Sequence, residues 1–159
     1  MHNMLQNQKS TPAQALPKLK HFCSYQERCH AEVKEKLYGM GLWKKDVETI
    51  VSRLIEEDYL NEERFARQFA GGKFRMKQWG KVKIRFALKQ KQVSEYCISK
   101  AMTEINDENY HSALKKILQK KAVALKGEKN TLVKKRKLLD HLLQKGYERE
   151  LVMNLINDL

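Results

Sequence analysis

The chain has 159 residues, a size that suits one domain, and 42% of them are apolar, which is enough for a buried core. Its 32 Lys and Arg exceed its 19 Asp and Glu, so the net charge is +13 and a polyanionic partner is favoured. Only two prolines and seven glycines occur, and no run of alternating β-branched residues reads as a strand. We therefore expect an all-α fold.

Neither export nor membrane insertion is indicated, because no long apolar segment occurs at the start of the chain or elsewhere, so we expect a cytoplasmic protein. The odd number of cysteines, three, fits a reducing compartment better than a disulfide framework. A zinc site built from His21, Cys23, Cys29 and His30 is a weaker alternative. On a helix the two cysteines would lie roughly 240° apart, so the four side chains could converge only through a loop. We expect no metal and no cofactor.

The first predicted module begins with a helix capped by Thr11, with Pro12 in its first turn and Gln14 completing a capping box. Pro17 could instead mark the start of this helix. Ser24 is predicted to cap the second helix. Residues 1–10 are expected to form a disordered tail, and the module is expected over residues 11–60, with helices near 12–23, 25–40 and 44–57.

The second predicted module, residues 61–106, opens at Asn61, a suitable N-cap followed by two glutamates in the first turn. Trp79-Gly80 interrupts the helical pattern, and Ser94 is placed to cap the last helix. The apolar stripe expected on the first helix is Phe65, Phe69, Gly72 and Met76, and the one on the second is Ile84, Ala87 and Leu88.

The third predicted module, residues 107–159, has helices expected from Asp107 to about Val123, from Thr131 to Gly146 and from Glu148 to Asp158.

An internal repeat becomes visible when Gly41, Gln92 and Gly146, which lie 51 and then 54 residues apart, are superposed. Six positions at fixed offsets from them are apolar in every module. They are Val33, Leu37, Leu42, Val47, Ile50 and Leu54, then Ile84, Leu88, Val93, Ile98, Ala101 and Ile105, then Leu138, Leu142, Tyr147, Val152, Leu155 and Leu159. The repeat predicts three tandem three-helix modules, about nine helices in all, in an elongated and curved body that we expect to be monomeric.

The positive charge is concentrated in two blocks. Ten Lys and Arg and no acid lie between Arg64 and Ser94, and ten more lie between Lys115 and Lys137, where Glu128 is the only acid. In the first block Lys81, Arg85 and Lys89 recur at every fourth residue and so form one stripe along a helix. A solvated face with no partner is the simpler alternative for both blocks. The predicted binding residues are Arg64, Lys73, Arg75, Lys77, Lys81, Lys83, Arg85, Lys89 and Lys91.

No catalytic motif is present, since nucleophile-elbow, Walker, HExxH and CxxC patterns are all missing, and we expect the protein not to be an enzyme. Trp79 is favoured as a wedge between helices over a platform for stacking bases. Gly71-Gly72 is expected to bend its helix or to let another backbone approach.

Five segments together resemble the RecX family, bacterial regulators of the RecA recombinase. They are EVKEKLYGMGL, DVETIVSRLIEEDYL, NEERFARQFA, WGKVKIRFAL and GYERELVMNLINDL, and the resemblance covers about Ala15 to Leu159. Three positions depart from the family pattern: Asn61-Glu62 stands where two aspartates are usual, Lys81 where proline is common, and Gln92 where a glycine is found.

The resemblance implies a protein that binds in the groove of the RecA filament and limits filament growth, recombination and coprotease activity, with a place in DNA repair and the SOS response. The basic blocks predict weak, nonspecific binding of single- and double-stranded DNA, because their cations suit phosphates and no base-reading helix is evident. An alternative is a helical protein that binds nucleic acid by itself without sequence preference. The structural motif that the family pattern and the apolar spacing place in the centre of the chain is Tyr59, Phe65, Phe69, Trp79, Gly80, Ile84 and Leu88.

Overall fold

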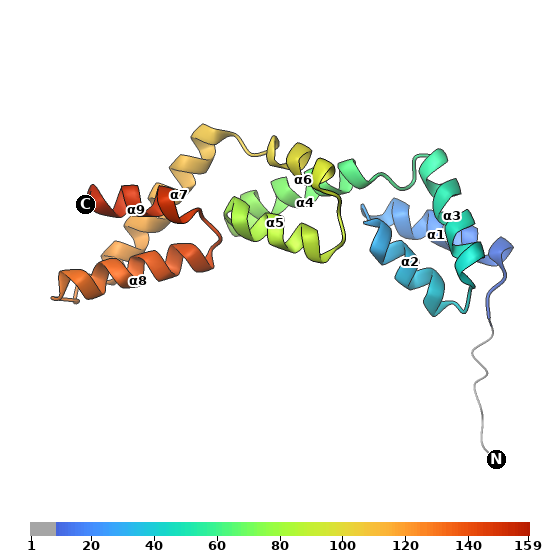
Figure 1. Cartoon of the computed structure of the whole chain (residues 1–159), viewed down its shortest axis with the longest axis horizontal. Helices are drawn as coiled ribbons and strands as arrows, with labels where there is room; N and C mark the ends of the chain where they lie inside the picture. The colour runs from blue at the N-terminus through green and yellow to red at the C-terminus, as the bar shows by residue number, and fades with distance from the viewer. Residues whose placement is uncertain (1–8) are drawn as a thin grey trace, which may run out of the picture.

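The computed structural model describes residues 9–159, and over this range it contains nine α-helices and no strand (Figure 1). The helices are α1 Pro12–Tyr25, α2 His30–Gly39, α3 Lys44–Glu56, α4 Glu62–Lys77, α5 Lys81–Gln90, α6 Glu95–Met102, α7 Asp107–Ala124, α8 Thr131–Gln144 and α9 Arg149–Asn157. The all-α fold with about nine helices is confirmed. The first eight residues of the predicted disordered tail lie outside the described residues.

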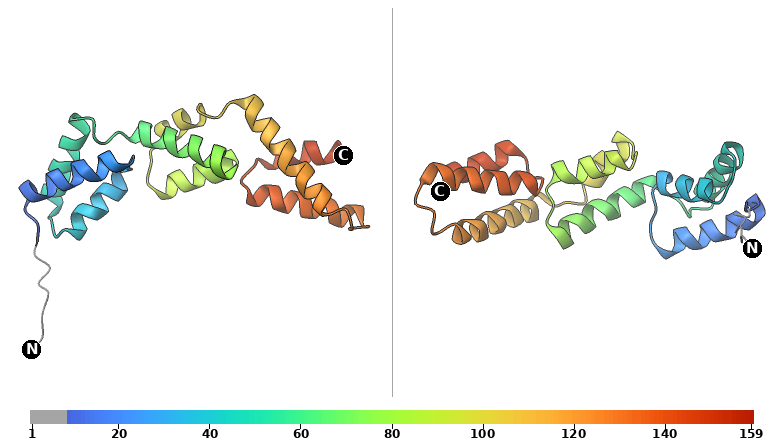
Figure 2. Two further views of the ribbon diagram at one scale, coloured as in Figure 1. Left: turned by 180° about the vertical axis from the view of Figure 1, so that it is seen from behind. Right: turned by 90° about the horizontal axis from the view of Figure 1, so that it is seen from below.

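The helices follow one another in three groups of three, α1 to α3, α4 to α6 and α7 to α9, along an elongated and curved body (Figures 1 and 2). We call these groups unit 1, unit 2 and unit 3. The helices that pack most closely against each other, such as α4 with α6 and α8 with α9, belong to the same unit. Each unit therefore buries its apolar faces mainly within itself.

The start of α1 follows the sequence closely. The Thr11 hydroxyl accepts a hydrogen bond from the Gln14 N–H at 3.2 Å, and the Gln14 side-chain oxygen accepts one from the Thr11 N–H at 3.0 Å. This reciprocal pair is the predicted capping box, and it places Pro17 inside the helix rather than at its start.

The predicted N-cap at Ser24 is wrong. Helix α1 continues to Tyr25, and the Ser24 hydroxyl donates to the Lys20 carbonyl one turn earlier at 2.7 Å. Helix α2 begins only at His30, after Cys29 as its N-cap. Burial explains the difference, because Leu19 and Cys23 are four residues apart on the inner face of α1 and keep the helix packed up to Ser24.

The repeat found in the sequence has a backbone counterpart. Gly41, Gln92 and Gly146 all adopt left-handed conformations, with φ of 84°, 62° and 95°. The apolar positions that share this register are buried, except for Leu155, which is half-buried, and Leu159. Leu159 is 65% exposed because α9 ends at Asn157, before that residue is reached.

We expect Gln92→Gly to raise the free energy of unfolding by about 0.5–1 kcal/mol. The left-handed conformation strains a residue with a Cβ by about 1–2 kcal/mol, and glycine relieves this strain. Part of the stability gained is offset by the greater freedom of glycine in the unfolded chain. Urea denaturation with an unchanged slope measures the gain. The matched control is Gln90→Gly, because Gln90 is an exposed residue of α5, where the same change should destabilise by about 1 kcal/mol. Loss of stability in Gln92→Gly would contradict the proposed strain.

The predicted apolar stripe of α4 is correct at Phe65 and Phe69, which pack in the core, but wrong at Met76, which is 86% exposed. The inner face of α4 instead runs through Ala70 to Phe74, whose ring lies 5.9 Å from that of Tyr110. Met76 follows Phe74 by two residues, a rotation of about 200° around the helix, so it points to solvent.

The buried residues form two separate clusters. One lies entirely in unit 1 and comprises Ala15, Leu19, Cys23, Val33, Leu37, Leu42, Val47, Ile50, Val51, Leu54 and Leu60. The other runs without interruption through units 2 and 3 and takes only Cys29 from unit 1. Units 2 and 3 therefore share one core, while unit 1 has its own.

Candidate partner-binding surface

The start of α5 is fixed by the backbone of unit 3. The Gly80 N–H donates to the Lys145 carbonyl at 2.8 Å, and the Val82 N–H donates to the Gly146 carbonyl at 2.9 Å. A Cβ atom at Gly80 would lie 2.2 Å from the carbonyl carbon of Gly146. Glycine is therefore required where these two segments of the backbone meet.

Two buried tyrosines complete this junction. The Tyr110 hydroxyl accepts from the Lys81 N–H at 3.0 Å and donates to the Glu148 carboxylate at 2.8 Å, while the Tyr147 hydroxyl donates to the Gln78 carbonyl at 2.9 Å. Burial raises the pKa of Tyr147 to about 12, and burial raises the pKa of Tyr110 as well. Together these contacts hold α5 at a fixed orientation to unit 3.

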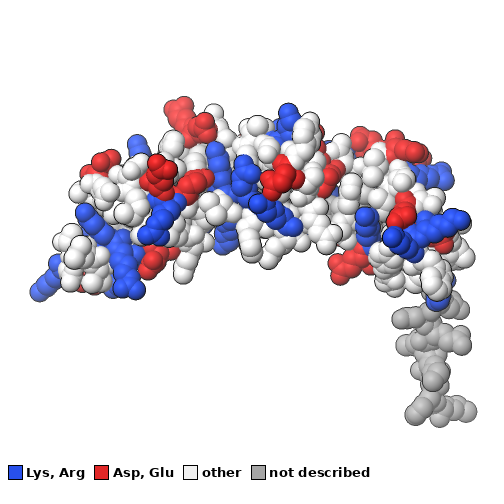
Figure 3. Space-filling model, in the orientation of Figure 1, with Lys and Arg blue, Asp and Glu red and all other residues white. Residues whose placement is uncertain are grey.

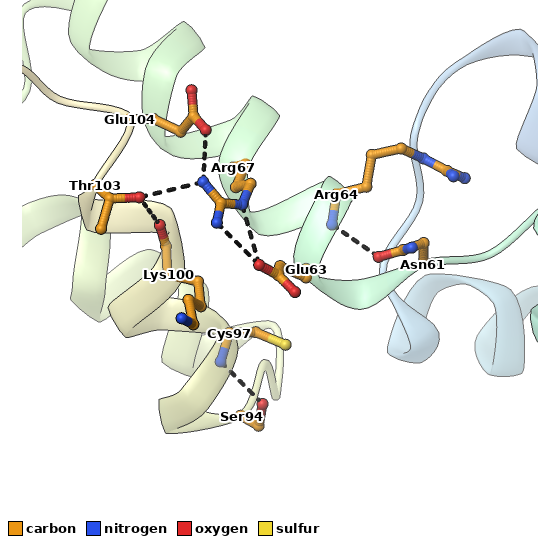
Figure 4. A network of polar contacts seen from close by, with 9 residues as sticks. All are labelled: Asn61, Glu63, Arg64, Arg67, Ser94, Cys97, Lys100, Thr103 and Glu104. Atoms are coloured by element: carbon orange, nitrogen blue, oxygen red, sulfur yellow. Dashed lines mark hydrogen bonds and ion pairs between the residues drawn. The ribbon is translucent and has the colours of Figure 1, made fainter.

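Five cations of the first basic block are engaged in ion pairs, four of them predicted binding residues and the fifth Arg67, which was not predicted. Arg67 donates to Glu63 at 3.0 Å and to Glu104 at 2.8 Å, and it also reaches the Thr103 hydroxyl, as Figure 4 shows. The remaining pairs are Arg64 with Glu27 and Asp58, Lys81 with Asp107, Lys89 with Glu95, and Lys91 with Glu32.

The three residues of the predicted stripe, Lys81, Arg85 and Lys89, consequently differ in exposure and in ion pairing. The Lys81 side chain is only 24% exposed, pairs with Asp107 at 3.3 Å and lies over the Tyr110 ring at 4.7 Å. Lys89 pairs with the Glu95 carboxylate on the solvent-exposed surface, where an ion pair contributes little to stability. Lys81 therefore belongs to the junction between the units, and reversing its charge would disturb packing as well as charge.

Five predicted cations make no ion pair within residues 9–159, and we call them the central basic surface. They are Lys73, Arg75 and Lys77 of α4 and Lys83 and Arg85 of α5. Trp79 links the two helices, because the Lys73 ammonium lies 5.0 Å and the Lys83 ammonium 4.6 Å from its ring centroid. The sequence did not show that Lys73 and Lys83 share one tryptophan, because this depends on how α4 and α5 fold back around Trp79.

The motif residues of the centre lie mostly in or against the core. Ile84 and Leu88 are fully buried and Phe65 nearly so, while Phe69 and Trp79 are half-buried with their rings in an edge-to-face arrangement at 6.5 Å. Trp79 thus fills space between helices while the ammonium groups of two lysines lie over its ring.

The expected close approach of another backbone is not found at Gly72, where an added Cβ would meet nothing within 4 Å. At Gly71 the three atoms nearest to an added Cβ belong to the flexible guanidinium of Arg75. Helix α4 runs from Glu62 to Lys77 through both glycines, and the predicted bend stays a prediction.

The second basic block covers the hairpin of α7 and α8. Between Lys115 and Lys137 the described chain has one ion pair, between Lys137 and Glu128 at 3.2 Å. Figure 3 shows Lys and Arg gathered on unit 3 and across the middle of the molecule, with acidic side chains interspersed.

The cysteines do not form a site. Cys23, Cys29 and Cys97 are buried and free, and burial raises the pKa of each thiol, which disfavours the reactive thiolate. Within residues 9–159 no group of three or more His, Cys, Asp or Glu side chains is arranged to hold a metal ion. The same residues include no helix that is both long and apolar enough to cross a membrane.

Solved structures share the fold. A crystal structure of RecX from Lactobacillus salivarius matches 93% of this chain and 96% of its own with a TM-score of 0.84 at 20% identity. Another, a crystal structure of regulatory protein RecX, matches 93% of this chain and 74% of its own with a TM-score of 0.79 at 22% identity.

Several curated relatives with similar sequences are also named regulatory protein RecX. The regulatory protein RecX of Clostridium tetani is 31% identical over 129 residues, which are 80% of this chain and 59% of that protein. The regulatory protein RecX of Prosthecochloris aestuarii is 26% identical over 140 residues, covering 87% of this chain and 88% of that protein. The chain spans 59%, 55% and 60% of the length of three clostridial relatives that it matches.

Two family models match adjoining parts of the chain. The second three-helix domain of RecX matches residues 61–102, which hold α4 to α6, and the third three-helix domain matches residues 107–156, which hold α7 to α9. These two matches together cover more than half of the chain, and they agree with both the fold and the named relatives. The chain belongs to the RecX family of regulatory proteins.

Proposed function

We propose that this chain is a regulator of the RecA recombinase that binds the RecA filament on DNA and limits filament growth, recombination and coprotease activity. Membership of a family of regulatory proteins supports the regulatory role. The observation that carries the proposed mode of action is the central basic surface, five cations with no acidic partner on two helices. The regulator acts by binding rather than by chemistry.

The geometry of this surface suits a long anionic partner. Lys77 and Arg85 lie on different helices and make no ion pair, and α5 is held at a fixed angle by the backbone of unit 3. Charges held on a rigid support lose little side-chain and segmental freedom on binding. Phosphates and acidic side chains along a nucleoprotein filament provide charges of the opposite sign at repeated spacing.

Titration of RecA's DNA-dependent ATP hydrolysis tests the proposal. The unmodified protein should lower the rate. Lys77→Glu/Arg85→Glu should weaken this inhibition by about tenfold or more. The slope of the logarithm of its affinity against the logarithm of salt concentration should fall by about two units, one for each cation removed. The matched control is Lys34→Glu/Lys45→Glu, which makes the same charge change at exposed positions of unit 1 and should inhibit normally. Thermal unfolding should show both variants to be folded, since surface substitutions usually alter stability by about 0.5 kcal/mol or less each.

Equal inhibition by the two variants would exclude the central basic surface as the contact with RecA. A protein that leaves the ATP hydrolysis unchanged, yet binds DNA equally with and without RecA, would instead be a nucleic-acid-binding protein that acts alone.

A further inference from the structure

A cavity of about 280 Å³ lies at the boundary between units 2 and 3. Its walls come from the connection between α4 and α5, from the second half of α7, and from the end of α8 and the residue that follows it. The polar residues that line it are Gln78, Lys120, Lys121, His141 and Lys145, and the buried side chain of Ile117 contributes an apolar wall.

The charge of this cavity is unbalanced. Three lysines line it, no acidic residue does, and none of the three has a carboxylate within ion-pair distance in the described chain. Lys121 and Lys145 are half-buried, so their charges are less screened than those of lysines that project freely into water. A cluster of this kind is stabilised when an anion occupies the space between the ammonium groups.

His141 is the fourth basic group. Burial lowers the pKa of its imidazole, and the charges of Lys121 and Lys145 lower that pKa further. The ring is therefore favoured in its neutral form while the site is empty. A bound anion would reverse the electrostatic part of this effect, so His141 reports on the occupancy of the cavity.

The walls are held in place by contacts described above. Gln78 adopts a left-handed conformation with φ of 54°, and its carbonyl accepts from the Tyr147 hydroxyl at 2.9 Å. The carbonyl of Lys145 accepts from the Gly80 N–H at 2.8 Å. The backbone that carries two of the lining residues is thus fixed before any ligand enters.

We propose that this cavity binds a phosphate group. The donors are three ammonium groups, an imidazole and the side-chain amide of Gln78, which come from three parts of the chain and surround a space suited to the oxygens of a tetrahedral anion. A planar carboxylate is better matched by the fork of an arginine, and no arginine lines the cavity. The phosphate could belong to a nucleic-acid backbone or to a free phosphorylated compound, because the two share this chemistry.

Inorganic pyrophosphate at constant ionic strength is the probe, with the imidazole resonances followed by NMR and that of His141 identified from its loss in His141→Gln. We expect saturable binding that raises the pKa of His141. Lys121→Gln/Lys145→Gln should weaken the binding by about tenfold or more, since hydrogen bonds to charged groups are the stronger ones. The matched control is Lys115→Gln/Lys116→Gln, which removes two exposed charges from α7 outside the cavity and should bind as the unmodified protein does.

Competition identifies the source of the phosphate. Displacement of pyrophosphate by a single-stranded oligonucleotide, but not by its uncharged methylphosphonate counterpart, would assign the site to the nucleic-acid backbone. Retention of pyrophosphate in the presence of the oligonucleotide would assign it to free phosphorylated compounds.

The proposal is overturned if the His141 resonance does not respond, if both lysine pairs affect binding equally, or if oligoglutamate displaces pyrophosphate as effectively as pyrophosphate itself. RecA takes no part in these measurements, so failure of this site leaves the proposed regulation of RecA standing.

Discussion

Gly80→Ala is expected to lower the free energy of unfolding by about 3 kcal/mol or more. The added Cβ would lie 2.2 Å from both the carbonyl carbon and the oxygen of Gly146 and 2.4 Å from the nitrogen of Tyr147. All three are backbone atoms, which cannot turn aside as the end of a flexible side chain can. Relief requires α5 to move away from unit 3, which would break the hydrogen bonds from Gly80 and Val82 and open the shared core.

The control for this substitution is Gly72→Ala, the same chemical change in the middle of α4. Nothing lies within 4 Å of the added Cβ there, so the variant should gain about 0.5–1 kcal/mol from the better helix propensity of alanine. Urea denaturation of both variants measures the two effects in opposite directions. A Gly80→Ala variant as stable as the unmodified protein would show that the contact between units 2 and 3 is not rigid.

Raising the pH from 10 to 12 is expected to remove roughly 4 kcal/mol of stability through Tyr110 and Tyr147. In the unfolded chain a tyrosine ionises near pH 10, whereas burial raises the pKa of Tyr147 to about 12 in the folded state and raises the pKa of Tyr110 too. The folded state therefore keeps protons that the unfolded state releases. Their contribution is fully present below pH 10 and is lost as the pH rises, by up to about 1.4 kcal/mol per pH unit for each tyrosine.

Urea denaturation at a series of alkaline pH values measures this loss, and phenolate absorbance follows ionisation directly. Tyr147→Phe removes the bond to Gln78 and lowers stability at neutral pH, yet it should make the decline above pH 10 less steep. Tyr38→Phe is the control at an exposed position and should leave the decline unchanged. An equally steep decline in Tyr147→Phe would show that this hydroxyl does not contribute to it.

The local features of the fold could be predicted because they depend on neighbouring residues. Asn61 and Ser94 accept hydrogen bonds from backbone N–H groups three residues later, at 2.9 Å and 3.3 Å, as their positions before the helices suggested. Ser24 has the same chemistry and does not cap a helix, because it directly follows the buried Cys23 in the last turn of α1 and its hydroxyl donates back to the Lys20 carbonyl. A capping residue therefore predicts a helix start only where the apolar pattern permits one.

The sequence did not predict which charged side chains are paired. Arg64 is paired with Glu27, 37 residues earlier, and Lys91 with Glu32, 59 residues earlier, so the block without acids is partly neutralised by other helices. The cavity beside His141 likewise depends on elements that are distant in the chain. Which cations remain without a carboxylate is decided by tertiary packing, and a count of charges along the sequence cannot show it.

The division of the buried residues into two clusters bears on the order in which the chain can fold during synthesis. Every residue of the first cluster lies between Ala15 and Leu60, so this cluster can close before the rest of the chain has left the ribosome. The second cluster needs Tyr147, Val152 and Ile156, which are made last. Helices α4 to α6 must therefore wait for unit 3 with part of their apolar surface open, and open apolar surface of this kind is what makes a folding intermediate prone to aggregate.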